Sequence, residues 1–144
     1  MIHPPPFSAH CAAIGFPLRS VRWSWAARSL DGSKILFTVW QDEVSDGVYI
    51  LYPVTERRPG KIPETANTQL GAREALRLAE EALGDSQISV FGILCVADNT
   101  DGLKRKRKTF DRYNLLRLRL SRDARGYLLA TIGEQVTVEK FVKP

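Results

Sequence analysis

One stretch with helical periodicity stands among short segments in which apolar and polar residues alternate, and this contrast restricts the possible folds. Between Ala72 and Leu83, apolar residues recur at the three- and four-residue intervals of one helix face. Asn67 or Thr68 is the expected N-cap, and Gly84 is the expected C-terminal stop. The stretch predicts a single amphipathic helix. The apolar stripe consists of Ala72, Ala75, Leu76, Ala79 and Leu83.

The other periodic segments predict strands joined by short turns. Leu30-Asp31-Gly32-Ser33 has the composition of a turn and predicts a hairpin between the strands on either side of it. Ile88–Ala97 is almost continuously apolar, which is typical of a strand covered on both faces, so we expect it at the centre of the sheet. The expected strands are Val21–Ala27, Lys34–Val44, Val48–Val54, Ile88–Ala97, Tyr113–Leu120, Tyr127–Ile132 and Gln135–Val142.

Together these elements predict an α+β fold with a curled, mostly antiparallel sheet of about six to seven strands, an open barrel, and one main helix. A chain of 144 residues that is 44% hydrophobic is long enough to bury its own core. We expect a Pro-rich, extended N-terminal arm over residues 1–20 and a single α+β domain over residues 21–144. Nothing resembles a signal peptide or a membrane span, so we expect no membrane partner and a cytoplasmic location, or a nuclear one if the source has a nucleus.

Cysteine and histidine usage argues against a disulfide or a metal centre. Cys95 lies inside the apolar strand, where a thiol usually acts as a small core residue, and Cys11 lies far from it in sequence. His3 and His10 fall in the expected arm without the spacing of a ligand pair. We therefore expect neither a metal nor a cofactor.

Positive charge is concentrated in one part of the chain. Residues 101–125 contain ten lysines and arginines but only three aspartates. A concentrated positive field indicates a polyanionic partner, although basic runs also occur on solvated loops. The residues expected to contact phosphates are Lys104, Arg105, Lys106, Arg107, Lys108, Arg117 and Arg119.

Aromatic residues gather near the beginning of the chain and suggest a second kind of contact. If the Lys34–Val44 strand is regular, Trp40 and Asp42 lie on the same face of it. An indole ring beside a carboxylate suits a pocket for a nucleobase, because the ring stacks and the carboxylate accepts hydrogen bonds. The alternative is that the aromatic rings belong to the core and the acid forms a turn. The expected base pocket consists of Trp23, Trp25, Trp40, Asp42 and Tyr49.

The order of these segments resembles a small domain associated with bacterial HNH-type endonucleases, of PUA-like or SRA-like type. The resemblance covers roughly Val21–Phe141: a Trp-Ser-Trp strand, a Trp-x-Asp-Glu strand end, a helix, an apolar strand and a basic segment before a final hairpin. It implies a target-recognition module that turns a base, including a modified one, out of the stack. The chain has no paired His-Asn-His arrangement, so the resemblance implies that this chain binds and a partner nuclease cuts.

The leading hypothesis is therefore a nucleic-acid-binding module, with DNA favoured over RNA and without catalytic activity. One alternative is a protein-interaction module that uses the basic face against an acidic partner. Another is a Mg²⁺-dependent nuclease built on Asp42 and Glu43, together with Asp46 and with Arg58 or Lys61 nearby in sequence. The sequence has no Gly-rich phosphate loop and no histidine outside the expected arm, which argues against other common enzyme classes.

Overall fold

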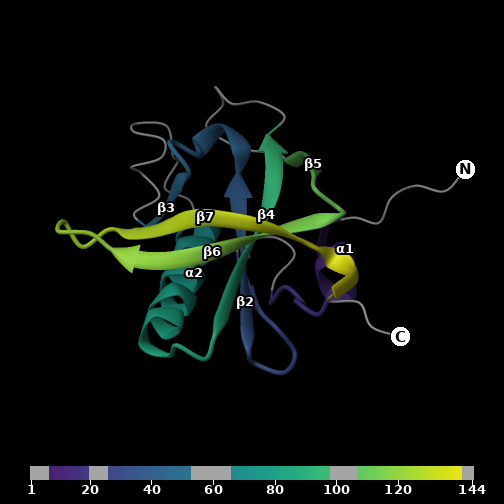
Figure 1. Ribbon diagram of the computed structural model, residues 1–144, viewed down its shortest axis with the longest axis horizontal. Helices are drawn as coiled ribbons and strands as arrows, with labels where there is room; N and C mark the ends of the chain where they lie inside the picture. The colour runs from purple at the N-terminus through teal and green to yellow at the C-terminus, as the bar shows by residue number, and fades with distance from the viewer. Residues whose placement is uncertain (1–6, 20–25, 53–65, 98–106, 141–144) are drawn as a thin grey trace, which may run out of the picture.

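The computed structural model describes residues 7–19, 26–52, 66–97 and 107–140 (Figure 1). In these residues a curled, mixed seven-stranded sheet is combined with two α-helices, which confirms the expected α+β open barrel. The elements are α1 (Phe7–Ala13), β1 (Ala26–Arg28), β2 (Lys34–Trp40), η1 (Gln41–Glu43), β3 (Val48–Tyr52), α2 (Ala66–Gly84), β4 (Ser89–Ala97), β5 (Arg107–Phe110), β6 (Asn114–Arg122), β7 (Leu128–Thr137) and η3 (Val138–Lys140).

The strands are ordered β1-β2-β4-β6-β7-β3, and β5 pairs with β4. Each pair is antiparallel except β2 with β4, which run in the same direction. Parallel strands need a long crossover connection, and β3 and α2 lie in the connection between these two. Figure 1 shows the long β6–β7 hairpin running across β2 and β4. The position of β4 between β2 and β6 confirms that it is a central strand.

The register of the strands divides the side chains between two faces of the sheet, because directly paired residues share a face. Ion pairs from Arg28 and Arg122 reach Glu81 and Glu80 of α2, which places α2 on the face shared by these arginines. We call this the α2 face. The opposite face contains Phe110, whose ring contacts residues of α1, and we call it the α1 face. Because both faces are covered, six of the seven residues of β2 are buried.

The N-terminal segment differs from the extended arm expected from the sequence. Phe7–Ala13 forms α1, and both Cys11 and Phe16 are completely buried in the core. The prolines that suggested an extended conformation lie before Phe7 and at Pro17, so none interrupts the helix itself. The expectation of an extended conformation was wrong for Phe7–Ala13.

The helix α2 has nearly the expected bounds, but the side of the helix that is buried differs from the expected stripe. It begins at Ala66, so Asn67 and Thr68 lie inside the helix and neither is its N-cap. Its buried apolar residues include Ala75, Leu78 and Ala79, whereas Leu83 is exposed.

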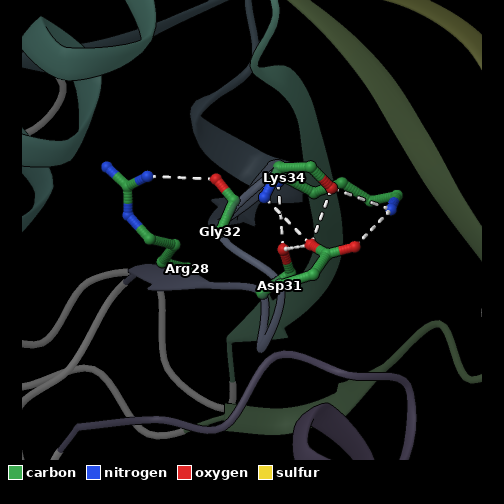
Figure 2. Close-up of polar contacts among 6 residues, drawn as sticks. Arg28, Asp31, Gly32 and Lys34 are labelled. Carbon is green, nitrogen blue, oxygen red and sulfur yellow. Dashed lines mark hydrogen bonds and ion pairs between the residues drawn. The ribbon is translucent and has the colours of Figure 1, made fainter.

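The turn between β1 and β2 is held by the side chain of Asp31 (Figure 2). Its Oδ1 atom accepts hydrogen bonds from the Ser29 hydroxyl at 2.7 Å, the Ser33 hydroxyl at 2.7 Å and the Ser33 backbone N–H at 2.9 Å. The donors from Ser33 and then Ser29 hold the pKa of Asp31 well below its usual value. Gly32 has a φ of 78°, a left-handed conformation that suits glycine, and this confirms the turn expected there.

The strand β7 contains a bulge opposite β6. Leu116 pairs with Gln135 and Leu118 pairs with Ile132, so Gly133 and Glu134 together oppose Arg117. A Cβ atom at Gly133 would lie 3.1 Å from the carbonyl oxygen of Arg117, closer than ordinary contact. Glycine therefore permits a close approach of the two backbones here, and the two strands expected from the sequence are one bulged strand.

In the described part of the chain, no helix has both the length and the apolar character needed to cross a membrane.

Candidate functional site

The structure places two members of the expected base pocket in the hydrophobic core. The side chain of Trp40 is 9% exposed and that of Tyr49 is 1% exposed. The strand β2 ends at Trp40, and Asp42 is an exposed residue of η1, so strand alternation does not relate the two side chains. Trp40 and Tyr49 are thus core residues and do not offer a stacking surface to a base, contrary to the expectation from the sequence. Trp23 and Trp25 lie outside the described residues.

The acidic residues of the nuclease hypothesis lie on η1 and the turn after it. Asp42 and Glu43 belong to η1, and Asp46 occupies a left-handed turn position with a φ of 51°. Among residues 7–19, 26–52, 66–97 and 107–140, no three His, Cys, Asp or Glu side chains gather closely enough to hold a metal ion. Arg58 and Lys61 lie outside these ranges. The convergent ligands that a metal-dependent nuclease requires are therefore not found in this part of the chain.

A surface hollow of about 340 Å³ lies at the β6–β7 bulge. Two of the expected phosphate-binding residues, Arg117 and Arg119, contribute to it from β6, and both are exposed. They are two residues apart on a strand, so they project from the same face. The hollow is lined by Arg117, Leu118, Arg119, Thr131, Ile132, Gly133 and Glu134.

The two arginines of the hollow differ in their contacts. Arg117 Nε lies 3.4 Å from Glu134 Oε1, and its guanidinium carbon lies 5.1 Å from the centre of the Phe91 ring. Arg119 pairs with Thr131 across the two strands, and no carboxylate contacts it within the described residues. An exposed ion pair such as Arg117–Glu134 contributes little stability, typically less than about 1 kcal/mol, so an anion can compete for the arginine. The hollow thus offers two guanidinium groups and one hydroxyl to an anionic ligand.

The structure places only one other expected phosphate-binding side chain. Lys104, Arg105 and Lys106 lie outside the described residues, and the side chain of Lys108 in β5 does too. Arg107 is half-buried on the α1 face, where its Nε atom lies 3.3 Å from Cys95 Sγ. Its guanidinium carbon lies 3.6 Å from the centre of the Phe7 ring and 5.5 Å from that of the Trp40 ring.

Arg107 and Arg117 lie over the same face of the sheet. Arg107 contacts Cys95 and Arg117 lies over Phe91, and these two β4 residues point to one side because they are an even number of positions apart. The four residue steps from Phe91 to Cys95 correspond to about 13 Å along the strand. The basic residues that the structure describes in β5 and β6 are thus distributed along the α1 face, except Arg122 at the end of β6, which bonds to α2.

Two polar residues beside the Phe110 ring were not expected to be functional. His10 of α1 is 7% exposed, its ring centre lies 5.1 Å from that of Phe110, and its Nε2 atom is buried without a hydrogen-bond partner in the described structure. The guanidinium carbon of Arg112 lies 4.4 Å from the centre of the same ring. No sequence pattern links His10 with Arg112, because the fold brings together residues far apart in the chain.

The two cysteines are free thiols and both are completely buried. Burial raises the pKa of Cys11 to about 12 and also raises the pKa of Cys95, while the charge of Arg107 acts in the opposite direction on both. Thiolate formation is therefore suppressed at neutral pH, and neither thiol has the character of a nucleophile.

Comparison with known proteins gives no match to a protein-family model, to a curated protein or to a solved structure.

The environment of His10 predicts that the fold loses stability at mildly acidic pH. Burial lowers the pKa of His10 below its ordinary value of 6.5, and the charge of Arg112 adds to this effect, while Asp111 opposes it. Between the two pKa values the unfolded chain binds a proton that the folded chain does not, so the free energy of unfolding falls as the pH drops below about 6.5. Urea unfolding at pH 7.5 and pH 5.5 measures the difference.

The control for this prediction is the same pair of measurements on His10→Gln and on His3→Gln. We expect His10→Gln to lose much of the pH dependence and His3→Gln to retain it. An equal decrease in all three proteins would contradict the assignment to His10. Ordinary carboxyl groups titrate mainly below this pH window and therefore interfere little.

Proposed function

We propose that the protein is a nucleic-acid-binding module that contacts phosphates with Arg117 and Arg119 at the β6–β7 bulge. The observation that carries the proposal is that these two exposed arginines share one strand face and line one hollow. Arg107 lies over the same face, farther along β4. A cytoplasmic location and a preference for DNA over RNA form part of the proposal.

Phosphate contacts suit this surface for two physical reasons. Guanidinium groups match phosphate oxygens in geometry and remain charged at all physiological pH values. Same-face residues on a strand are about 7 Å apart, so both side chains can reach one phosphate or two neighbouring phosphates. When a phosphate binds to Arg117, the Glu134 carboxylate would leave its ion pair with Arg117 and become hydrated. This exchange would cost little, since the ion pair is exposed.

Recognition of a base would require residues other than the phosphate-binding arginines. Trp40 and Tyr49 are buried, so the proposal assigns them no contact with a base. A PUA-like or SRA-like recognition module would need other rings, and Trp23 and Trp25 are the remaining candidates from the sequence. The phosphate contacts alone predict binding that depends strongly on salt and weakly on nucleotide sequence.

The test is fluorescence anisotropy with labelled single-stranded DNA, duplex DNA and RNA at several salt concentrations. For the unaltered protein we expect affinity to fall steeply as salt rises, because bound phosphates release counterions. In a double variant with Gln in place of both Arg117 and Arg119, the loss of each arginine should weaken binding about tenfold. This corresponds to about 1.5 kcal/mol per charged contact. The logarithmic salt slope should decrease by about 2.

Arg122→Gln is the matched control, because Arg122 belongs to the same strand but bonds to Glu80 on the α2 face. We expect this variant to bind almost as tightly as the unaltered protein. Affinity that is independent of salt, or an equal loss in Arg122→Gln, would contradict the proposal. A protein that binds no nucleic acid but captures an acidic protein through the same arginines would instead support the interaction-module hypothesis.

A further inference from the structure

The junction of α1 with β5 contains two stacked cations. The Phe7 and Phe110 rings meet edge to face, with centres 5.1 Å apart and planes at 85°. Arg107 lies over the Phe7 ring, and Arg112 lies over the Phe110 ring. Each ring of the pair therefore carries one guanidinium group. Cation–π contact of this kind favours the cation at the ring but does not neutralise its charge.

Neither cation forms an ion pair with a carboxylate among the described residues. Both side chains are half-buried, and Arg112 Nε is a buried atom without a hydrogen-bond partner. The partner of Arg107 is the thiol of Cys95, which is only a weak acceptor. Asp111 is adjacent in sequence, but its Oδ1 atom accepts the backbone N–H groups of Tyr113 and Asn114.

Charges that are partly removed from water are normally paired with opposite charge, because the loss of hydration is costly. At the junction neither guanidinium group has a carboxylate partner among the described residues, and the one carboxylate charge that acts on His10 is that of Asp111, which is bonded to backbone N–H groups. Both act on neighbouring residues of α1, since the charge of Arg112 is felt at His10 and that of Arg107 at Cys11. Arg107 and Arg112 lie over two rings whose centres are 5.1 Å apart, so an anion beside this pair of rings would be attracted by both cations.

His10 provides a third nitrogen at this place. Its side chain is almost completely buried, and its Nε2 atom has no partner within the described structure. A buried nitrogen without a partner costs free energy unless a ligand or water satisfies it. Nε2 can donate to an anion whenever it carries a proton.

We propose that this junction is a phosphate-binding site, in which the guanidinium groups of Arg107 and Arg112 and Nε2 of His10 donate to the oxygens of one phosphate group. Phosphate offers several strong acceptor oxygens and up to two negative charges, which fits two cations and a third donor. The phosphate belongs either to a nucleic acid or to a small molecule. The site is distinct from the β6–β7 hollow and does not depend on the function proposed for Arg117 and Arg119.

Nuclear magnetic resonance of the His10 ring tests the site directly. The chain has two histidines, so His3→Gln identifies the resonance of His10. Inorganic phosphate is titrated at pH 7.5 with the ionic strength held constant by chloride. We expect a saturable shift of the His10 resonance and a higher pKa of His10 at saturating phosphate, because the bound anion stabilises the imidazolium form. A resonance that does not change in a saturable way would overturn the proposal.

Substitution of Arg112 separates a specific site from general ionic effects. Arg112→Gln should weaken the phosphate response at least tenfold, and Arg112→Lys should weaken it less because it keeps the charge. Arg122→Gln should leave the response unchanged. If circular dichroism shows that Arg112→Gln does not fold, Arg112→Lys and Arg107→Lys are tested instead. An undiminished response to phosphate in both lysine variants would contradict the guanidinium contacts.

Two further arms identify the source of the phosphate. A dinucleotide with a 5′-phosphate is compared with the same dinucleotide without it and with inorganic phosphate. Tighter binding of the phosphorylated dinucleotide would assign the site to a nucleic-acid end, and tighter binding of inorganic phosphate would assign it to a small anion. The double variant of Arg117 and Arg119 should retain the inorganic phosphate response, so the two proposals can fail separately.

Discussion

Trp40→Ala is expected to lower the free energy of unfolding by about 3–5 kcal/mol. The indole ring is buried at the end of β2, where it pairs with Cys95 of β4 in the sheet register and lies beneath Arg107. Removing it deletes a large apolar surface and leaves a cavity that the surrounding strands cannot fill completely. Urea or thermal unfolding measures the loss.

The same residue distinguishes a core position from a base pocket. Trp40→Phe keeps most of the buried surface, so we expect it to fold and to bind nucleic acid with unchanged affinity. Leu30→Ala is the control for stability, because Leu30 is 81% exposed and its loss should change the free energy of unfolding by less than about 0.5 kcal/mol. If Trp40→Phe keeps its stability but loses affinity for one base or modification, Trp40 contacts the ligand and the core assignment is wrong.

Gly92→Ala is expected to lower the free energy of unfolding by about 1–3 kcal/mol through overpacking. Gly92 lies in β4, and an added Cβ atom would approach Val39 Cγ2 to 2.8 Å and Leu118 Cδ1 to 3.1 Å. Val39 is completely buried and β-branched, so its side chain cannot turn away easily. Gly84→Ala is the matched control, since nothing lies within 4 Å of a Cβ atom there.

A double-mutant cycle identifies the cause of the Gly92 effect. In a Val39→Ala background the crowded methyl group is absent, so Gly92→Ala should cost less than it does in the unaltered protein. Equal costs in the two backgrounds, measured by urea unfolding, would contradict steric conflict with Val39. The loss would then come from the backbone or from Leu118.

Local sequence signals were sufficient for much of the sheet. The apolar run of β4 predicted a strand covered on both faces because a short run rich in β-branched residues is typical of a buried strand. The turn at Asp31 and Gly32 was predictable because the hydrogen bonds that Asp31 accepts come from residues two positions away. The alternation of β6 similarly placed Arg117 and Arg119 on one face.

Other features depend on contacts that local patterns do not contain. The end of β2 at Trp40 separates that residue from Asp42, and the sequence alternation continues past this point. The bulge at Gly133 looked like a gap between two strands, although a glycine inside an alternating pattern is also the signal of a bulge. The docking of α1 depends on Phe110, a residue that no pattern within the N-terminal segment indicates.

The edge-to-face pair of Phe7 and Phe110 also has a consequence for the order in which the protein forms. Phe7 and Phe110 are roughly a hundred residues apart in the chain, and a contact that closes such a long loop forms slowly. Until β5 has joined the sheet, Phe7 of α1 lacks the cover that Phe110 provides. A partly folded state in which this contact is open therefore exposes the apolar side of α1, and exposed apolar surface of this kind favours aggregation.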